Sequence, residues 1–365
     1  MIDFRYHLVS IVAVFLALTV GLVLGTTMLQ DPLLNTLKSE TSDLREQSDT
    51  LRTEKERAEA LNEGGDEMAA VFAEDVLDRR LDGTGVVVVS APGADAEVRT
   101  GLESRVEQAG GTVEGHLALA DKYIDPDQAT FVGELADQLA EGADASGGAG
   151  GPYERAAARL AEAVGAVPED GDGGSGDGGE DGDGGSEEGE GSDEGGGGGI
   201  DGEAVLAGFA EAGLLTVEGE PVDAADAVLV VAPATPFPTG ASPSPEGEEA
   251  EPHGNDAVLP LVAAVGGDAP ALLAGDASAA GPGGLIARVR RDGTPVATAD
   301  AVGRPSGDVA AVLALAEALE DDPGHYGTGE EADGFLPDPP PPAREADETG
   351  ERTEKTADRR TPQAG

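Results

Sequence analysis

The sequence predicts an α/β fold with a mainly parallel sheet of the Rossmann or flavodoxin type, preceded by an N-terminal transmembrane helix and a helical, coiled-coil stalk. Three observations predict it: an uncharged apolar run near the N-terminus, a charged heptad stretch after it, and alternating apolar strands and helices from residue 66 onward. We therefore expect four parts, namely an anchor at residues 1–30, a stalk at 31–65, an α/β domain at 66–336 and a tail at 337–365.

The anchor is predicted from the run Leu8 to Leu29, which carries no charge and is long enough to cross a hydrocarbon core of about 30 Å. A cleaved signal peptide is the alternative, but such segments have apolar cores of about 7 to 15 residues. The one passable cleavage site, Val23 to Gly25, lies inside the apolar run. Arg5 precedes the apolar run, and Lys38 and Arg45 follow it. Because basic residues lie at both ends, charge alone does not determine the orientation of the anchor in the membrane. We expect a retained single-pass anchor in the cell membrane or envelope, with the bulk of the chain extracytoplasmic.

Small residues recur every four positions in the anchor and share one face of the predicted helix. They are Ala13, Ala17, Gly21 and Gly25. Small side chains let two helix backbones approach closely, and this contact drives the association of membrane helices. Single matches to this pattern are common by chance, but four in register predict a helix–helix contact and hence a homo-oligomer.

The stalk is predicted from apolar residues spaced by sevens between Leu33 and Glu63. They are Leu37, Leu44, Leu51 and Ala58. This is half of a coiled-coil seam, which would also join copies of the chain. The companion positions Thr41, Ser48 and Lys55 are polar, so a solitary amphipathic helix is the alternative. Gly64 and Gly65 are predicted to end the helix.

The α/β domain is predicted from alternating elements after Asp66. Strands are expected at 86–90, 112–119, 227–232, 271–275 and 295–298. Helices are expected at 94–109, 127–141, 152–164, 203–212 and 305–320. Asp127 is expected to cap its helix and Pro152 to lie in a first turn. Segments 168–199 and 239–255 and the tail are acidic or Pro-rich, low in complexity and predicted to be disordered.

Composition excludes several classes of function. The 365 residues carry a formal net charge of −51 at pH 7, and a field of that sign repels nucleic acid. Cysteine is absent, which removes disulfides, thiolate nucleophiles and cysteine-based metal sites. The acidic surface is expected to collect divalent cations loosely.

No catalytic or cofactor-binding residue is predicted, and we do not expect an enzyme. The turn Ser90 to Gly93 follows a strand, where many α/β proteins bind phosphate, but it lacks the glycine-rich fingerprints and a plain tight turn is the simpler interpretation. No pair of histidines has metal-ligand spacing. His325, in the turn Gly324 to Gly327, is a weak metal candidate, and a structural or surface histidine is the alternative. No persuasive pairing of histidine and serine is found.

Two stretches resemble the MctB copper transport protein family of actinobacterial envelopes. They are Phe4 to Gly25, and Thr298 to Leu319 followed by GHYGTG at Gly324 to Gly329. The resemblance runs from the first residue to about Pro337, outside the acidic inserts. It implies a role in copper homeostasis by transport or efflux at the envelope, with copper as the transported species.

The residues limit that role, because copper(I) prefers thiolate and thioether ligands and the chain has only Met1, Met28 and Met68. A single spanning helix encloses no pore, so transport would require an oligomer. The alternative from the residues alone is a membrane-anchored oligomeric scaffold whose α/β domain binds partners and which transports nothing itself. An α/β enzyme or nucleotide binder is the least favoured interpretation.

Overall fold

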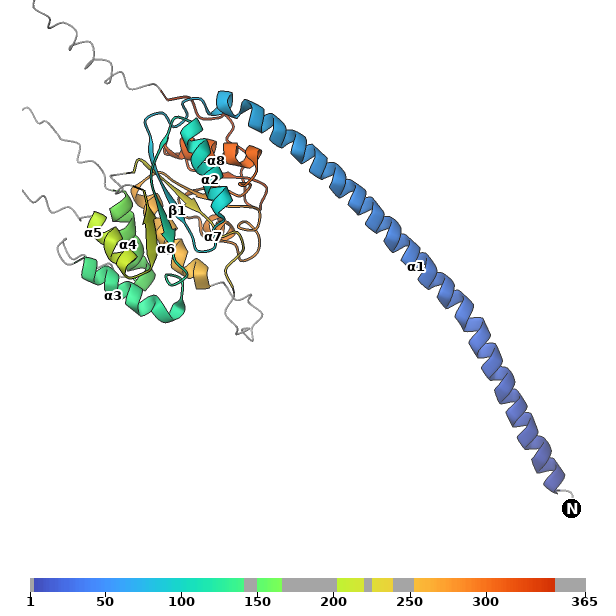
Figure 1. The fold of residues 1–365 in the computed structure, drawn as a ribbon. Coiled ribbons are helices and arrows are strands. Elements are labelled where there is room, and N and C mark those ends of the chain that lie inside the picture. Colours follow the sequence, from blue (N-terminus) through green and yellow to red (C-terminus); the bar gives the residue numbers. More distant parts are fainter. Residues whose placement is uncertain (1–2, 141–149, 166–201, 220–224, 239–252, 345–365) are drawn as a thin grey trace, which may run out of the picture. The chain divides into compact units, whose positions relative to one another are not determined.

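The computed structural model describes residues 3–140, 150–165, 202–219, 225–238 and 253–344 (Figure 1). Side chains are described in these ranges except for residues 3 and 26–36. The chain divides into two compact units, Met1–Gly65 and Asp66–Gly365.

The first element is one continuous helix, α1 (Asp3–Leu77). The prediction that Gly64 and Gly65 end the helix is therefore wrong. A glycine in a helix costs only about 1 kcal/mol relative to alanine. After the two glycines, Ala73 and Leu77 of α1 are completely buried in the core of the second unit. This tertiary packing offsets the free-energy cost of placing the two glycines in the helix. The part of α1 long and apolar enough to span a membrane is Phe4–Gly25, with a mean hydropathy of 2.7 and none of its apolar window buried.

The second unit is built on a seven-stranded sheet in the order β3-β2-β1-β4-β5-β6-β7. The strands are β1 (Gly85–Ser90), β2 (Thr112–Leu119), β3 (Leu215–Glu218), β4 (Ala227–Val231), β5 (Ala271–Ala274), β6 (Ala297–Ala299) and β7 (His325–Tyr326). Among the described strands, the β2–β3 pair alone is antiparallel, and the other pairs are parallel. Parallel neighbours need long crossover connections, and most of these carry a helix. The predicted fold class is confirmed.

Helices cover both faces of the sheet (Figure 1). They are α2 (Ala96–Gln108), α3 (Ala129–Leu139), α4 (Pro152–Val164), α5 (Gly202–Glu211), α6 (His253–Asp268), α7 (Leu285–Asp292) and α8 (Pro305–Ala318). Val87 and Val89 of β1 point into a core shared with α3 to α7. Val86 and Val88 point into a second core shared with α2, α8 and the last turns of α1. Because β1 is buried on both faces, it reads as a continuous run of valine.

Most predicted elements are present, and the differences have local causes. The helix expected from 127 begins as a 3-10 turn (Pro126–Gln128), and its cap is Asp125, whose carboxylate accepts the Asp127 N–H at 3.0 Å. Pro152 does lie in the first turn of α4. The strand expected at 295–298 is shifted to β6. The short strands β3 and β7 and the helices α6 and α7 were not predicted. Pro260 lies inside α6, and α7 is only eight residues long.

Two segments predicted to be disordered are partly ordered. His253 and Asn255 belong to α6, and the buried Asn255 donates from its side-chain amide to the Gly283 carbonyl at 3.0 Å. In the tail, Arg344 donates its backbone N–H to the Arg79 carbonyl at 2.9 Å. Such contacts come from tertiary packing and leave no trace in composition. The segments 168–199, 239–252 and 345–365 lie outside the described residues, and for them disorder stays a prediction.

Candidate functional site

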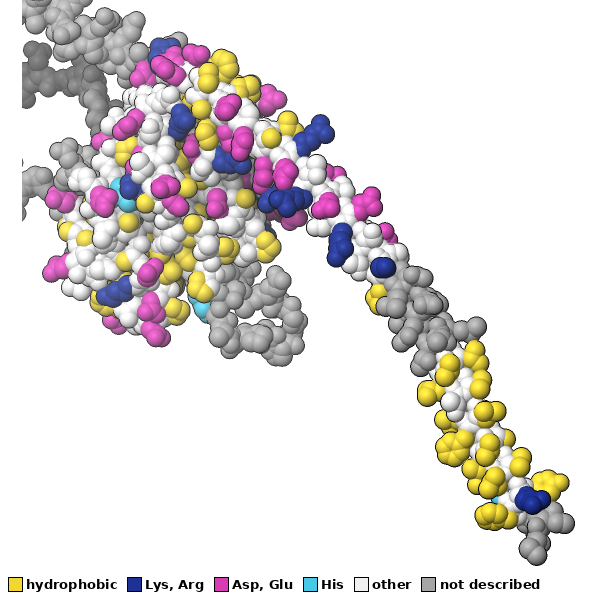
Figure 2. All heavy atoms as spheres, turned by 45° about the vertical axis from the view of Figure 1, so that its right-hand side comes forward, with side chains coloured by type: hydrophobic (Ala, Val, Ile, Leu, Met, Phe, Trp, Pro, Cys, Tyr) yellow, Lys and Arg dark blue, Asp and Glu magenta, His cyan; other side chains and the backbone are white. Residues whose placement is uncertain are grey.

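The predicted contact face of the anchor is open in the single chain. Ala13, Ala17, Gly21 and Gly25 are all exposed, and a Cβ added at Gly21 or Gly25 would meet nothing within 4 Å. Figure 2 shows apolar side chains around this part of α1 on the visible face. A helix that is apolar and uncovered in this way suits a lipid environment. The contact between copies stays a prediction.

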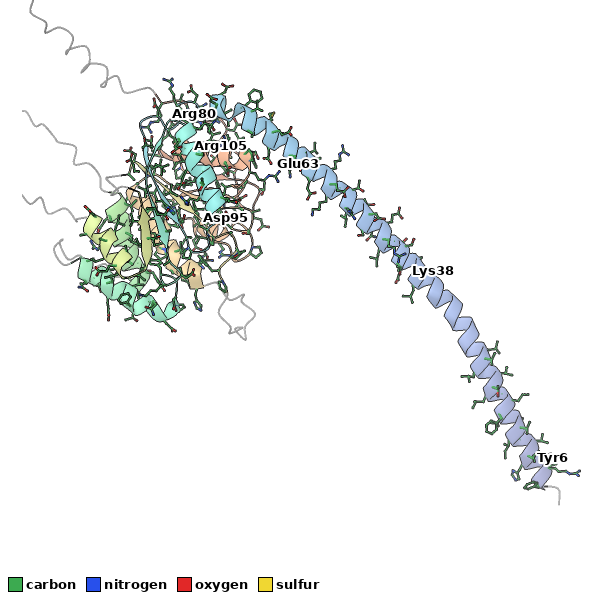
Figure 3. All side chains as sticks on the ribbon, viewed as in Figure 1. Tyr6, Lys38, Glu63, Arg80, Asp95 and Arg105 are labelled. Carbon is green, nitrogen blue, oxygen red and sulfur yellow. The ribbon has the colours of Figure 1, made fainter. Side chains whose placement is uncertain are left out.

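The predicted stalk seam is also uncovered. Leu37, Leu44 and Leu51 are more than half exposed, and Ala58 is exposed too. Away from the seam the helix carries pairs of charged side chains, such as Arg52 with Glu56 at 3.1 Å, among the side chains drawn between Lys38 and Glu63 in Figure 3. Exposed pairs of this kind contribute little to stability. The stalk therefore has a polar surface with one apolar line, and its association stays a prediction.

The point where strand order reverses, between β1 and β4, is the usual nucleotide site of such sheets. Here Ser90 ends β1 and Pro92 and Gly93 form a turn, in which the Gly93 carbonyl accepts the Ala234 N–H of the loop after β4 at 3.0 Å. The Asp95 carboxylate caps α2 by accepting the Glu97 N–H at 2.7 Å (Figure 3). A phosphate at this helix terminus would meet a carboxylate already bound there, so the geometry favours the plain turn.

A row of polar side chains crosses three adjacent strands on one face of the sheet. Ser90 Oγ lies 2.9 Å from His116 Nε2, and His116 Nδ1 lies 3.3 Å from Glu218 Oε2. The sequence does not reveal this contact between a histidine and a serine. The pairing depends on the register of β1 with β2, which places Val88 beside His116. No local motif signals such a register.

The row has the order of a serine-hydrolase triad, yet its surroundings do not support acyl transfer. The Ala91 N–H, which would begin an oxyanion hole, donates to the Val231 carbonyl at 2.9 Å, and Pro92 has no N–H. Glu218 is 65% exposed, whereas a triad acid is held buried. These side-chain contacts therefore link β1, β2 and β3, and the described residues around them do not form a complete catalytic site.

A fully buried ion pair organises the other end of the sheet. The side chains of Arg290 and Asp300 are both 0% exposed, with Nη1 and Oδ2 2.7 Å apart. Arg290 also donates to Thr298 Oγ1 at 2.9 Å and to the Tyr326 carbonyl at 2.9 Å. Asp300 accepts the Thr328 N–H at 2.6 Å. Removing either partner of such a buried, hydrogen-bonded ion pair would leave the other charge buried without compensation and would strongly destabilise the fold.

His325 and the glycines of the C-terminal GHYGTG stretch surround this ion pair. His325 Nδ1 lies 3.1 Å from Thr298 Oγ1, and burial, followed by the charge of Arg290, lowers the pKa of His325. Gly327 has φ of +134° and lies against the Asp300 carboxylate, which leaves no room for a Cβ. The GHYGTG stretch therefore packs against β6 and hydrogen-bonds to Thr298 and to Asp300, which follows the strand. No group of three metal-ligating side chains forms among the described residues, and a metal at His325 stays a prediction.

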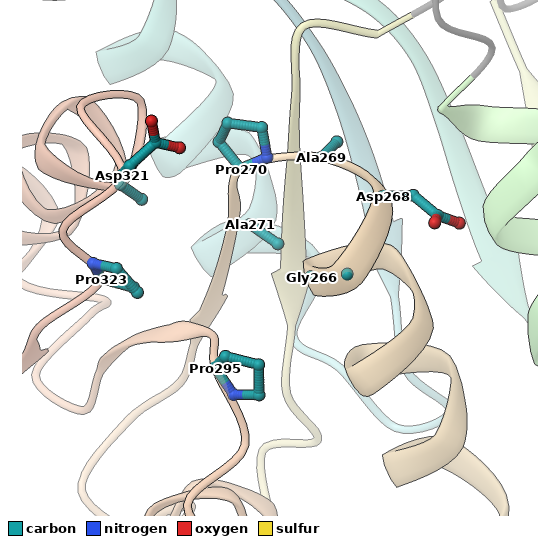
Figure 4. A pocket seen from close by; sticks show the side chains of 10 residues that line it. Gly266, Asp268, Ala269, Pro270, Ala271, Pro295, Asp321 and Pro323 are labelled. Carbon is teal, nitrogen blue, oxygen red and sulfur yellow. The ribbon is translucent and has the colours of Figure 1, made fainter.

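A pocket of about 280 Å³ lies at the amino ends of β5 and β6 (Figure 4). Three prolines contribute to its wall: Pro270, Pro295 and Pro323. Its ionisable groups are two carboxylates, Asp268 and Asp321, drawn on opposite sides of the view. A pocket with neither a base–nucleophile pair nor a cation to bind phosphate supports no reaction class.

Comparison with known proteins finds a family profile that matches most of the chain and curated relatives that align with about a third of it. The profile of the family described as "Copper transport outer membrane protein, MctB" matches residues 1–337. The copper transporters MctB of Mycobacterium tuberculosis and Mycobacterium bovis are 33% identical to this chain over 129 residues, which is 35% of this chain and 41% of each relative. That of Mycobacterium leprae is 34% identical over 125 residues, which is 34% of this chain and 39% of the relative.

The aligned part thus spans less than half of the length of these curated relatives. The names of these relatives describe copper transport by those proteins.

Proposed function

The chain belongs to the MctB family, and on that premise we propose that it takes part in copper transport or efflux at the cell envelope. In this proposal it is a single-pass membrane protein whose bulk lies outside the cytoplasm, and it is not an enzyme. The observation that carries the proposal is the joint presence of a family match over residues 1–337 and an uncovered apolar helix at Phe4–Gly25. Copper is the cargo, and no resident cofactor is proposed.

Transport by this chain requires several copies. One helix encloses no pore, and within a single chain no three metal-ligating side chains converge among the described residues. We propose that the small-residue face of the anchor and the seam of the stalk bring copies together. A copper contact would then be shared between copies or be transient, which suits a cargo that must also leave.

Copper content of cells tests the transport proposal. Deleting the gene should raise cell-associated copper and lower copper tolerance, and the full chain should restore both. As a matched control, zinc content should not change, because a general leak or envelope defect would disturb both metals. Unchanged copper content in the deletion strain would overturn the proposal.

A scaffold without transport activity is the second candidate. It is favoured by the absence of a converging metal site among the described residues and by the exposed apolar side chains of Met68, Val71 and Phe72 in the last turns of α1. Reconstituted vesicles separate the two candidates. Purified full-length protein that oligomerises in vesicles but passes no copper ions would support the scaffold, whereas copper flux would support transport.

Orientation is tested by a reporter fused after Gly365. Residue 65 lies inside α1, so a reporter inserted there would interrupt the helix. We expect the C-terminal alkaline phosphatase fusion to be active. A matched fusion to green fluorescent protein, exported by the secretory route, should not fluoresce. The reverse pattern would place the bulk of the chain in the cytoplasm and contradict an envelope-facing domain.

A further inference from the structure

A run of prolines follows the last strand of the sheet and lies on the surface of the α/β unit. It forms the segment 337–344, with the sequence PDPPPPAR, which we call the proline strap. Just before it, Phe335 and Leu336 are 38% and 45% exposed. The proposed function rests on the anchor and the family match, and it gives the proline strap no role.

The proline strap is held against the α/β unit at both of its ends. Before its first residue, the Gly334 carbonyl accepts a backbone N–H of the GHYGTG stretch at 2.9 Å. At its last residue, the Arg344 N–H donates to the Arg79 carbonyl at 2.9 Å. The side chain of Arg80 donates to the Pro341 carbonyl. A segment that is already ordered in this way loses little conformational entropy when another protein binds it.

Four successive prolines, Pro339 to Pro342, restrict the backbone of the strap. The proline ring fixes φ near −65°, and a residue that precedes a proline is kept in the extended region. These two restrictions together give a polyproline II helix, which has three residues per turn and no internal hydrogen bonds. The backbone at residues 340–344 accordingly forms neither helix, strand nor turn. Residues three apart share a face of such a helix, so Pro339 and Pro342 lie on the same face.

The exposure of the prolines shows which face is available to a partner. Pro339 and Pro342 are exposed, whereas Pro341 between them is buried against the α/β unit. Arg344, two residues after Pro342, is exposed as well. The exposed residues therefore have the spacing Pro-x-x-Pro-x-Arg. Prolines three apart on a polyproline II helix are the residues that aromatic-lined grooves recognise.

Arg344 indicates the charge of the partner. Its backbone N–H is already used, so the exposed guanidinium is the group that a partner contacts. Asp338 lies near the other end of the strap, and Glu345 follows Arg344 in the sequence, so the partner recognises one arginine and not a basic patch. A guanidinium stacks on aromatic rings and pairs with carboxylates. We therefore expect a groove with an aromatic ring and a carboxylate at the end that meets Arg344.

We propose that the proline strap is the ligand of a partner protein that carries an aromatic-lined groove for polyproline II helices. Pro339 and Pro342 enter the groove, and Arg344 lies at its acidic end. The groove belongs to a different protein, because this chain has only 3% aromatic residues and no tryptophan. The inference goes beyond the proposed function and is independent of it, since it uses neither the anchor nor the stalk seam.

A purified SH3 domain that selects Pro-x-x-Pro-x-Arg ligands is the probe for this surface. Binding to the full-length chain in detergent is followed by the fluorescence of the tryptophan in the groove of the probe, because this chain contains none. We expect saturable binding that Pro342→Ala and Arg344→Ala each weaken by about tenfold, as for central residues of an interface. The matched control Pro340→Ala removes an exposed proline from another face and should change the affinity much less. No binding, or equal binding of all the variants, would overturn the inference.

Two further measurements distinguish a ligand from a purely structural segment. The melting temperatures of Pro342→Ala and Arg344→Ala should equal that of the natural chain, because both side chains are exposed. A lowered melting temperature in both variants would assign the strap to the fold and overturn the inference. A synthetic peptide of residues 334–344 verifies the probe and should bind more weakly than the full chain, which holds the strap in place. Binding of the peptide without binding of the full chain would show that the α/β unit hides the strap, and would also overturn the inference.

Discussion

The two ends of α1 use apolar side chains in different ways. Over Phe4–Gly25 most of the described side chains are apolar, and all of them are exposed. In the second unit, Ala73 and Leu77 of the same helix are fully buried, and the sheet that they cover keeps its buried charges paired, as in Arg290 with Asp300. The anchor therefore depends on its surroundings for stability, whereas the α/β unit is stabilised by its own core.

The largest effect is expected when the buried ion pair of the α/β unit is broken. Asp300→Ala leaves the guanidinium of Arg290 buried without its partner and should lower the free energy of unfolding by about 3–5 kcal/mol. The measurement is thermal and urea unfolding of the full chain in detergent. The control Glu218→Ala removes an exposed partner and should cost at most about 1 kcal/mol. Equal effects of the two variants would show that burial does not govern these pairs.

A charge placed in the anchor should weaken membrane insertion without changing the α/β unit. Leu16→Arg replaces an exposed apolar side chain in the span and should disfavour membrane insertion by about 3–4 kcal/mol. The protein should become extractable by alkaline carbonate while the melting temperature of the α/β unit stays unchanged. Leu51→Arg, on the same helix beyond the span, is the control and should stay in the membrane. Loss of the α/β fold in Leu16→Arg would contradict the separation of the two regions.

A smaller effect is expected at Asp66, where α1 meets the α/β core. Burial alone would raise the pKa of Asp66, but hydrogen bonds from Ser306 and Arg304 outweigh it, and the pKa is lowered from its ordinary value of 3.8. Asp66→Asn should cost about 1.5–3 kcal/mol near neutral pH, the range for hydrogen bonds to charged groups.

The sign of the pH dependence follows from that lowered pKa. The stabilising contribution of Asp66 is present above the unfolded-state pKa and is lost as pH falls through the folded-state pKa. The difference in melting temperature between the natural protein and Asp66→Asn should therefore shrink below about pH 4. A difference that is constant from pH 7 down to pH 3 would show that the carboxylate charge is not what stabilises this contact.

The smallest effect concerns contact between anchors. Gly21→Leu fills a position where a Cβ meets nothing in the single chain, so the fold should not change. If copies pack through this face, the added bulk should weaken association in detergent by about 1 kcal/mol, measured by energy transfer between labelled copies. Leu22→Gly changes side-chain volume on a neighbouring face and serves as the control. Identical association of all three proteins would argue against the small-residue face.

Local pattern predicted the elements whose own residues decide them. The valine run of β1 reads as a strand buried on both faces, and the apolar periodicity of α8 reads as a helix, because burial leaves a mark on each of their residues. The two-residue strand β7 and the Pro260-containing helix α6 leave no such mark, since neighbouring elements determine them. The same limit hid the contact of Ser90 with His116, which depends on strand register.

By itself, the sequence determined that a segment suits a bilayer, that the chain is strongly acidic and cysteine-free, and that an α/β unit follows. These properties are sums over residues or short periods, which can be counted along the chain. Tertiary structure decided that α1 continues past Gly65, that Arg290 and Asp300 form a closed pair, and that Met68, Val71, Phe72 and Val76 stay uncovered. Each of these depends on which distant residues come into contact, because burial is a property of the packed chain.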